Sequence, residues 1–157
     1  CRRRLRPSLS SSSSLCRLAR ATASPSPPTA PSGAAGYGGD GQLGHGDRQN
    51  QLLPKKVEAF AGRCVVAVSA GEDHSLALAA DGAVWSWGYG ASGELGHGDA
   101  QHQPLPKKIE ALAGQLVVAV SAGTLHSLAA TAAGSVWSWG WGGRGRLGHD
   151  DRQLQLL

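Results

Sequence analysis

The sequence repeats itself at a fixed interval of 52 residues. Residues 36–87 align with residues 88–139 without a gap and are identical to them at 36 of 52 positions, and a partial third copy covers 140–157. The segment Leu-Gly-His-Gly-Asp at 43–47, for example, returns unchanged at 95–99. A period near 50 residues is typical of propeller and solenoid arrays, in which each copy buries its apolar surface against its neighbours. The repeat therefore predicts a stack of similar units.

Each unit has the sequence character of a small antiparallel sheet. Asp81-Gly82 separates two apolar runs and is a hairpin signal, because a two-residue turn needs positive φ. Four short strands per unit is the number found in a propeller blade. The strands are expected at residues 55–60, 65–69, 74–79 and 84–87.

The predicted strands carry apolar residues on both faces. In strand 65–69, simple alternation places Val66 with Val68 on one face and Val65 with Ala67 on the other. A sheet that is covered on both faces has this composition, and a blade between two blades meets that condition. Cys64, which aligns with Leu116, is expected to be a buried apolar residue.

The glycines after the tryptophan-rich strand resemble a dinucleotide-binding turn. Residues 88–93 match Gly-x-Gly-x-x-Gly, but that motif needs to open a helix. The residues that follow are rich in glycine and include Pro104 and Pro106, which oppose a helix. The same pattern recurs at 36–41 and 140–145, and one nucleotide site in every unit is implausible. The glycines are predicted to be turn positions, and no cofactor is expected.

The first 35 residues differ in composition from the repeats. They are rich in Arg, Ser and Pro, and residues 1–38 hold six Arg and no acidic residue. Such a segment cannot bury enough apolar surface to order itself, so a disordered N-terminal tail is predicted. It resembles an organelle transit peptide, a basic arm for chromatin or another polyanion, or a solvated tail. The remaining residues carry more acidic than basic groups, which gives no general signature of nucleic-acid binding.

The motifs together resemble a known repeat family. Their order is Gly-x-Leu-Gly-His-Gly-Asp, Val-x-x-Val-Ser-Ala-Gly-x-x-His-Ser-Leu-Ala and Gly-x-Val-Trp-Ser-Trp-Gly. This order is similar to the regulator of chromosome condensation repeat over residues 36–157. The resemblance implies a seven-bladed β-propeller with four antiparallel strands in each blade. For this chain it implies an all-β fold, a partial β-propeller of about two to three blades.

The family contains several functional groups. The resemblance implies a protein-interaction platform, and it leaves two alternatives open. One is a guanine-nucleotide exchange factor for a small GTPase such as Ran, a type that also docks on nucleosomes. The other is the substrate-recruiting part of a HECT-type ubiquitin ligase. The chain begins at Cys1 and its last residues resemble the middle of a motif, so a fragment of a larger protein is expected.

No residue pattern in the repeats predicts an enzyme. His45, His97 and His149 recur after Leu-Gly, and His74 and His126 recur before Ser-Leu. Regular spacing of this kind is expected from histidines that tie turns within their own blade. Ser75 and Ser127 each follow a histidine, but adjacent strand residues point to opposite faces and cannot act as a nucleophile and its base. We therefore predict no catalytic residue and no metal site in this segment.

The aromatic residues follow the same period. A repeated aromatic is explained by packing between blades, and an aromatic binding surface is the alternative. The tryptophans concerned are Trp85, Trp87, Trp137, Trp139 and Trp141. Lys55-Lys56 and its copy Lys107-Lys108 stand next to Glu58 and Glu110 and are expected to be solvated charges.

Partner contacts are predicted where the copies differ within an unchanged frame. Glu72-Asp73 becomes Thr124-Leu125, a change from acidic to uncharged residues. Loop positions of this kind carry binding function on rigid scaffolds, and neutral drift of solvated residues is the alternative. A second loop also changes its charge, from Asp40 to Ser92 to Arg144. The sequence leaves the compartment open between cytoplasm, nucleus and an organelle, and has no apolar run long enough to predict a membrane span.

Overall fold

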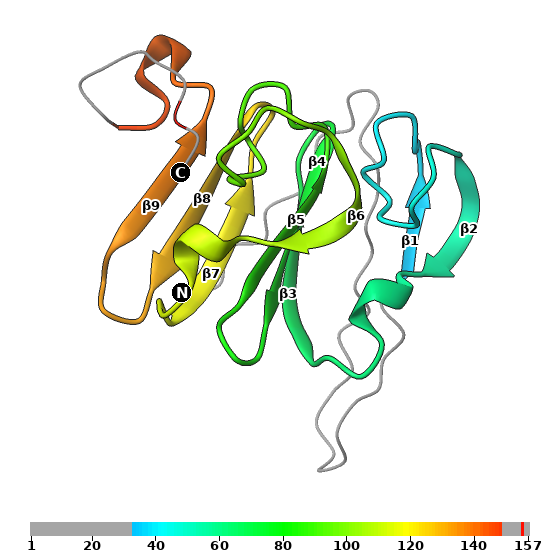
Figure 1. Ribbon diagram of the computed structural model, residues 1–157, viewed down its shortest axis with the longest axis horizontal. Coiled ribbons are helices and arrows are strands. Elements are labelled where there is room, and N and C mark those ends of the chain that lie inside the picture. The colour runs from blue at the N-terminus through cyan, green and yellow to red at the C-terminus, as the bar shows by residue number, and fades with distance from the viewer. Residues whose placement is uncertain (1–32, 149–154, 156–157) are drawn as a thin grey trace, which may run out of the picture.

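The computed structural model describes residues 33–148 and residue 155 of the chain. This part of the chain forms three antiparallel sheets that lie side by side (Figure 1). The first sheet contains β1 (Gly33–Gly36) and β2 (Gln51–Lys56). The second contains β3 (Val65–Ala70), β4 (His74–Ala79), β5 (Val84–Gly88) and β6 (Gln103–Lys108). The third contains β7 (Val117–Ala122), β8 (His126–Thr131) and β9 (Val136–Gly140).

The predicted all-β fold is confirmed. The helical elements among the described residues are single 3-10 turns, namely η1 (Glu58–Phe60), η2 (Glu110–Leu112) and η3 (Gly143–Gly145). Residues 89–102, which include most of the Gly-x-Gly-x-x-Gly motif, contain turns and bends and lead directly into β6. No helix begins within residues 89–102, as predicted from the glycines and prolines of this loop.

Each blade crosses the boundary between two sequence copies. The second sheet takes β3, β4 and β5 from residues 36–87 and its outer strand β6 from residues 88–139. The predicted strand at 55–60 is wrong, because the strand ends at Lys56 and Glu58 to Phe60 form η1. The strand instead includes Pro54, which an outer strand tolerates because one of its edges needs no amide donor.

Tight turns set the register of the inner strands. Asp81 accepts a hydrogen bond from the amide of Ala83 (3.0 Å), and the turn joins β4 to β5. The pairing then places Leu76 opposite Ser86 and Ala77 opposite Trp85. The hairpin predicted from Asp81-Gly82 is therefore present.

A β-bulge changes the predicted faces of the inner strand. The pairing of β3 with β4 shifts between Val65 and Ala67, and β7 shifts at the equivalent place. The extra residue moves Val65 to the same side as Val68, whereas Ala67 packs on the opposite side and Val66 is half exposed. The expected pairing of Val66 with Val68 is therefore wrong.

The hydrophobic core consists of two layers, one on each side of the second blade. Along β4, Leu76 and Leu78 point into the layer shared with the third sheet, and Ala77 points into the layer shared with the first. All three are essentially inaccessible to solvent. The blades therefore derive their stability from burial against one another.

Two expectations concern residues at the edges of this architecture. Strand β1 begins at Gly33, so the strand starts before the predicted end of the tail at residue 35, and residues 1–32 lie outside the described residues. Cys64 was expected to be buried but is exposed, because it lies in the loop before β3. Its copy Leu116 is also exposed.

Candidate functional site

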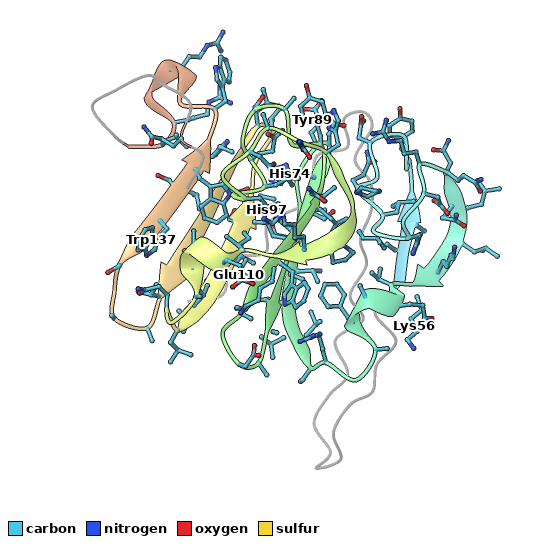
Figure 2. All side chains as sticks on the ribbon, in the orientation of Figure 1. Lys56, His74, Tyr89, His97, Glu110 and Trp137 are labelled. Carbon is cyan, nitrogen blue, oxygen red and sulfur yellow. The ribbon has the colours of Figure 1, made fainter. Side chains whose placement is uncertain are left out.

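The loops that differ between copies gather at one end of the sheets. The β3–β4 loop (71–73) and the β5–β6 loop (89–102) leave the same end of the second blade, at the top of Figure 1. The equivalent loops of the neighbouring sheets, 37–50 and 123–125, lie at that end as well. We call this end the loop face. Figure 2 shows Tyr89 and His74 toward it and Lys56 toward the opposite end.

The acidic pair predicted to contact a partner lies on the loop face. Glu72 is exposed and Asp73 is half-buried. Burial raises the pKa of the Asp73 carboxyl above its ordinary value, and the nearby charges of Asp40 and Glu72 raise it further. The fold therefore brings Asp40, from the loop of the first sheet, close to the predicted pair and concentrates negative charge there.

The equivalent pair in the next copy, Thr124 and Leu125, is uncharged. Thr124 is exposed and Leu125 is half-buried. The carbonyl of Leu125 accepts a hydrogen bond from the amide of Trp141 (2.8 Å), just as that of Asp73 accepts one from Tyr89 (2.8 Å). The two predicted pairs are therefore held by the same backbone bond.

A repeated hydrogen-bond arrangement joins successive blades beneath the loop face. The carbonyl of Gln42 accepts bonds from Ser75 Oγ (2.9 Å) and Trp87 Nε1 (2.8 Å). We call this arrangement the carbonyl clamp. In the next copy the carbonyl of Glu94 accepts bonds from Ser127 Oγ (2.7 Å) and Trp139 Nε1 (2.8 Å). The repeated serines are therefore donors that fix the blades together.

The clamp requires glycine where the indole meets the neighbouring loop. Gly44 has φ of +76°, and a Cβ atom built there would lie 2.8 Å from Trp87 Nε1. A side chain at this position would be strained and would also displace the indole. Blade packing thus explains the glycine at position 44.

The histidines have two different structural roles. His97 Nε2 lies 3.0 Å from Ser86 Oγ of the same blade, which confirms the prediction for this residue. His74 Nε2 lies 2.9 Å from Ser127 Oγ of the following blade, so the prediction is wrong for His74. Burial lowers the pKa of His74 to about 4, with a smaller contribution from His126, so the ring is neutral at pH 7.

A buried carboxyl group occupies the loop of the second copy. Glu94 is fully buried, and its Oε2 accepts a bond from the amide of Ser92 (2.8 Å). Gln42 makes the same bond to the amide of Asp40 (3.0 Å). Burial raises the pKa of Glu94, and this effect exceeds that of the backbone hydrogen bonds, which act in the opposite direction. Glu94 thus performs the structural task of a glutamine.

Four of the tryptophans pack between blades and one does not. Trp87 and Trp139 are buried core residues, and Trp85 and Trp137 pack against the core. Trp141 is 37% exposed on the loop face, and the guanidinium of Arg146 lies 4.3 Å from its ring centroid. Sequence reasoning missed this aromatic–arginine pair. The change from Gln42 and Glu94 to Arg146 was the available signal.

In the described part of the chain, no group of three or more His, Cys, Asp or Glu side chains is arranged to hold a metal ion. None of the helical turns described is long and apolar enough to cross a membrane. A hollow of about 270 Å³ lies at the end opposite the loop face, between the Asp81–Gly82 turn and the loop at 112–116.

Family profiles match most of the described chain. The profile described as "Regulator of chromosome condensation (RCC1) repeat" matches residues 34–78 and 81–130. A second profile with the same description matches residues 65–94 and 117–146. The two matches of the second profile are offset by the 52-residue period.

Curated relatives include a plant receptor and animal ubiquitin ligases. The Ultraviolet-B receptor UVR8 of Arabidopsis thaliana is 35% identical over 118 residues, which are 75% of this chain and 27% of UVR8. The E3 ubiquitin-protein ligase HERC2 of Homo sapiens is 45% identical over 126 residues, which are 74% of this chain and 3% of HERC2. The chain therefore corresponds to a minor part of each of these relatives.

Solved structures share the arrangement of blades. Prp20p from Saccharomyces cerevisiae, described with its binding properties to Gsp1p and histones, matches with a TM-score of 0.71 and 27% identity. The match covers 80% of this chain and 32% of that one. Human WBSCR16 matches with a TM-score of 0.65 and 30% identity, over 78% of this chain and 32% of that one.

Proposed function

Because the chain belongs to the regulator of chromosome condensation (RCC1) repeat family, we propose that residues 36–157 act as a protein-interaction platform. The blades form a rigid frame, and the loop face contacts the partner. The observation that carries this proposal is the contrast between the carbonyl clamp, which is the same in both copies, and the loops around it, which change in charge. Binding residues are commonly found on loops held by such a frame.

Glu72 and Asp73 are the proposed partner contacts in the first variable loop, and Thr124 and Leu125 are those in the second. The cluster of Asp40, Glu72 and Asp73 concentrates negative charge beside a half-buried carboxyl group. A partner that brings a cation to this cluster would relieve the repulsion among the three groups. The second loop offers an uncharged surface.

A quantitative pulldown tests this assignment. The variant Glu72→Thr/Asp73→Leu gives the first loop the residues of the second copy. The matched control, Glu58→Ala/Glu110→Ala, removes the same charge from two exposed carboxylates at the opposite end, each 73% accessible. Recovery of a partner confirmed with purified protein should fall at least about tenfold for the first variant, a change of ~1.4 kcal/mol, and remain unchanged for the control. Equal recovery with both variants would refute the assignment.

Guanine-nucleotide exchange is the second candidate, favoured by the likeness to Prp20p, whose published description includes binding to Gsp1p. A nucleotide-release assay on a panel of purified small GTPases tests this candidate. Faster release in the presence of the chain would support exchange, and unchanged rates across the panel would remove it.

Substrate recruitment in a HECT-type ubiquitin ligase is the third candidate, favoured by 45% identity to a segment of HERC2. The complete reading frame tests it. A HECT-like domain in the same reading frame would support recruitment, whereas a complete frame without one would exclude it.

A further inference from the structure

The loop face carries a second charged surface, opposite in sign to the acidic cluster. We propose that Trp141, Arg144 and Arg146 form a docking site for a short acidic segment of a partner protein. We call these three residues the arginine shelf. The proposal rests on the proposed interaction function and names the chemistry of one contact, but its residues are separate from Glu72 and Asp73.

The first observation is the fixed orientation of Arg146. Its guanidinium lies 4.3 Å from the centroid of the Trp141 ring, and its Nε donates a hydrogen bond to the carbonyl of Gly143 (3.0 Å). That bond uses one of the five N–H donors of a guanidinium. Within the described residues, no carboxylate forms a salt bridge with Arg146. A planar, positioned guanidinium of this kind suits a carboxylate, which can accept two parallel bonds.

The second observation is the backbone at Arg144. This exposed residue has φ of 66° and ψ of 20°, whereas Asp40 and Ser92 at the equivalent positions are not in the left-handed region. A bulky side chain is uncommon in this conformation, and such strain is concentrated at functional sites. The third loop thus places two cations within five residues of an exposed tryptophan.

The surroundings favour an acidic protein segment over a nucleic acid. One face of the Trp141 ring is covered by Arg146, and a Cβ atom on Gly143 would lie 2.4 Å from Trp141 Cζ2. The ring is therefore poorly placed to stack with a base, as single-stranded nucleic acids require. A long polyphosphate crossing the loop face would also meet the acidic cluster at Asp73. A short run of Asp or Glu avoids that repulsion.

The electrostatics supply an internal reporter for this site. Burial lowers the pKa of His126, and the charge of Arg146 lowers it further. An anion bound at Arg146 offsets that charge, so the pKa of His126 should rise when the shelf is occupied. Binding elsewhere on the chain would leave His126 unchanged.

The test is an NMR titration of the isotope-labelled chain with a peptide of about twelve residues in which Glu and Gly alternate. The same peptide with Gln in place of Glu measures binding that does not depend on charge. Arg144→Gly/Arg146→Gln should weaken binding of the Glu peptide at least about tenfold, since it removes both charged donors. Glycine at 144 accepts the observed φ without strain, which protects the fold of the loop.

The chain offers a matched control in its other arginine–tryptophan pair. Arg63 lies 4.7 Å from the centroid of the Trp85 ring, in the loop after η1 at the end opposite the loop face. Arg63→Gln should change the affinity for the Glu peptide by less than about twofold, because it removes a positive charge from a different surface. A spectrum with unchanged strand resonances shows that each variant is folded.

Three outcomes would overturn the proposal. These are equal binding of the Glu and Gln peptides, equal affinity of the shelf variant and the unmodified chain, and tighter binding of a single-stranded oligonucleotide of the same charge. Glu72→Thr/Asp73→Leu should not weaken binding of the Glu peptide. If the proposal for the arginine shelf is refuted, the pulldown test of Glu72 and Asp73 is therefore unaffected.

Discussion

The contacts between blades are the same in both copies, whereas the residues of the loop face differ from copy to copy. Between blades, the equivalent serine and tryptophan donate to the equivalent backbone carbonyl in both copies. The distance from the indole nitrogen to the carbonyl oxygen is 2.8 Å in each copy. On the loop face, equivalent positions change from Asp40 to Ser92 to Arg144. The difference shows that the repeat specifies how blades join and leaves the loops free to differ in charge. Every prediction below tests that division.

The largest loss of stability is expected at Trp139, which belongs to both the carbonyl clamp and the hydrophobic core. Trp139 is fully buried and bonded to the carbonyl of Glu94, so Trp139→Ala should lower the free energy of unfolding by about 4 kcal/mol. Trp141→Ala, on the loop face, should cost less than about 1 kcal/mol because its side chain is already partly exposed. Urea denaturation measures both. Similar losses for the two variants would contradict the division.

Acidification should also lower the free energy of unfolding, because it protonates the buried His74. His74 has a pKa near 6.5 in the unfolded chain and about 4 in the folded chain, so the folded state resists protonation. Stability should therefore be lost as the pH falls from about 6.5 to about 4, by about 3 kcal/mol from this residue. Unfolding free energies at several pH values measure this effect. His74→Gln should remove that part of the pH dependence, and an unchanged profile would count against the buried neutral ring.

A smaller effect, a gain in stability, is expected from replacing the buried carboxyl group of Glu94 with an amide. Glu94→Gln retains the acceptor for the amide of Ser92 and removes an ionisable group from the interior, as Gln42 already does in the first copy. It should raise the free energy of unfolding at pH 7 by about 1 kcal/mol. Because burial raises the pKa of Glu94, the unmodified chain should lose stability as the pH rises through that pKa, whereas the variant should not.

The reciprocal variant is the control for this prediction. Gln42→Glu should destabilise the chain at pH 7 by about the same amount, ~1 kcal/mol. Thermal unfolding at pH 5 and pH 8 compares the two variants. A destabilising Glu94→Gln, or a neutral Gln42→Glu, would show that the two loops are not equivalent.

The smallest effect is expected at the repeated surface ion pairs. Lys108 Nζ lies 3.5 Å from Glu110, and both side chains are substantially exposed. Exposed pairs contribute little, so Lys108→Ala should change the free energy of unfolding by less than about 0.5 kcal/mol. Its copy, Lys56→Ala, should behave in the same way. A loss above about 1 kcal/mol at either site, measured by calorimetry, would show that these repeated charges belong to the frame.

The sequence predicted the β fold and most strand positions because both depend on local patterns. The Asp81-Gly82 turn and the β-branched run at 65–69 carry their information in neighbouring residues, and the 52-residue period shows that the same elements recur in the next copy. The outer strand was misplaced, since Pro54 and Pro104 oppose most strands but are tolerated at an outer position. The bulge after Val65 also escaped prediction, because no residue type requires it.

The candidate site was predicted only in part. Glu72 and Asp73 lie on the loop face as expected of variable loops, but their neighbour Asp40 is 32 residues away from Glu72 in sequence and only the fold brings its charge near. The carbonyl clamp could not be read from the sequence, because every residue has a carbonyl. The contact of His74 with Ser127 likewise joins residues 53 apart.

The most direct test exchanges the two variable loops within one chain. The variant Glu72→Thr/Asp73→Leu/Thr124→Glu/Leu125→Asp keeps composition and net charge and alters only loop-face positions. We predict that its free energy of unfolding in urea stays within about 0.5 kcal/mol of that of the unmodified chain, as expected for surface positions. A loss of more than about 2 kcal/mol would show that these loops are part of the frame, and it would contradict the account.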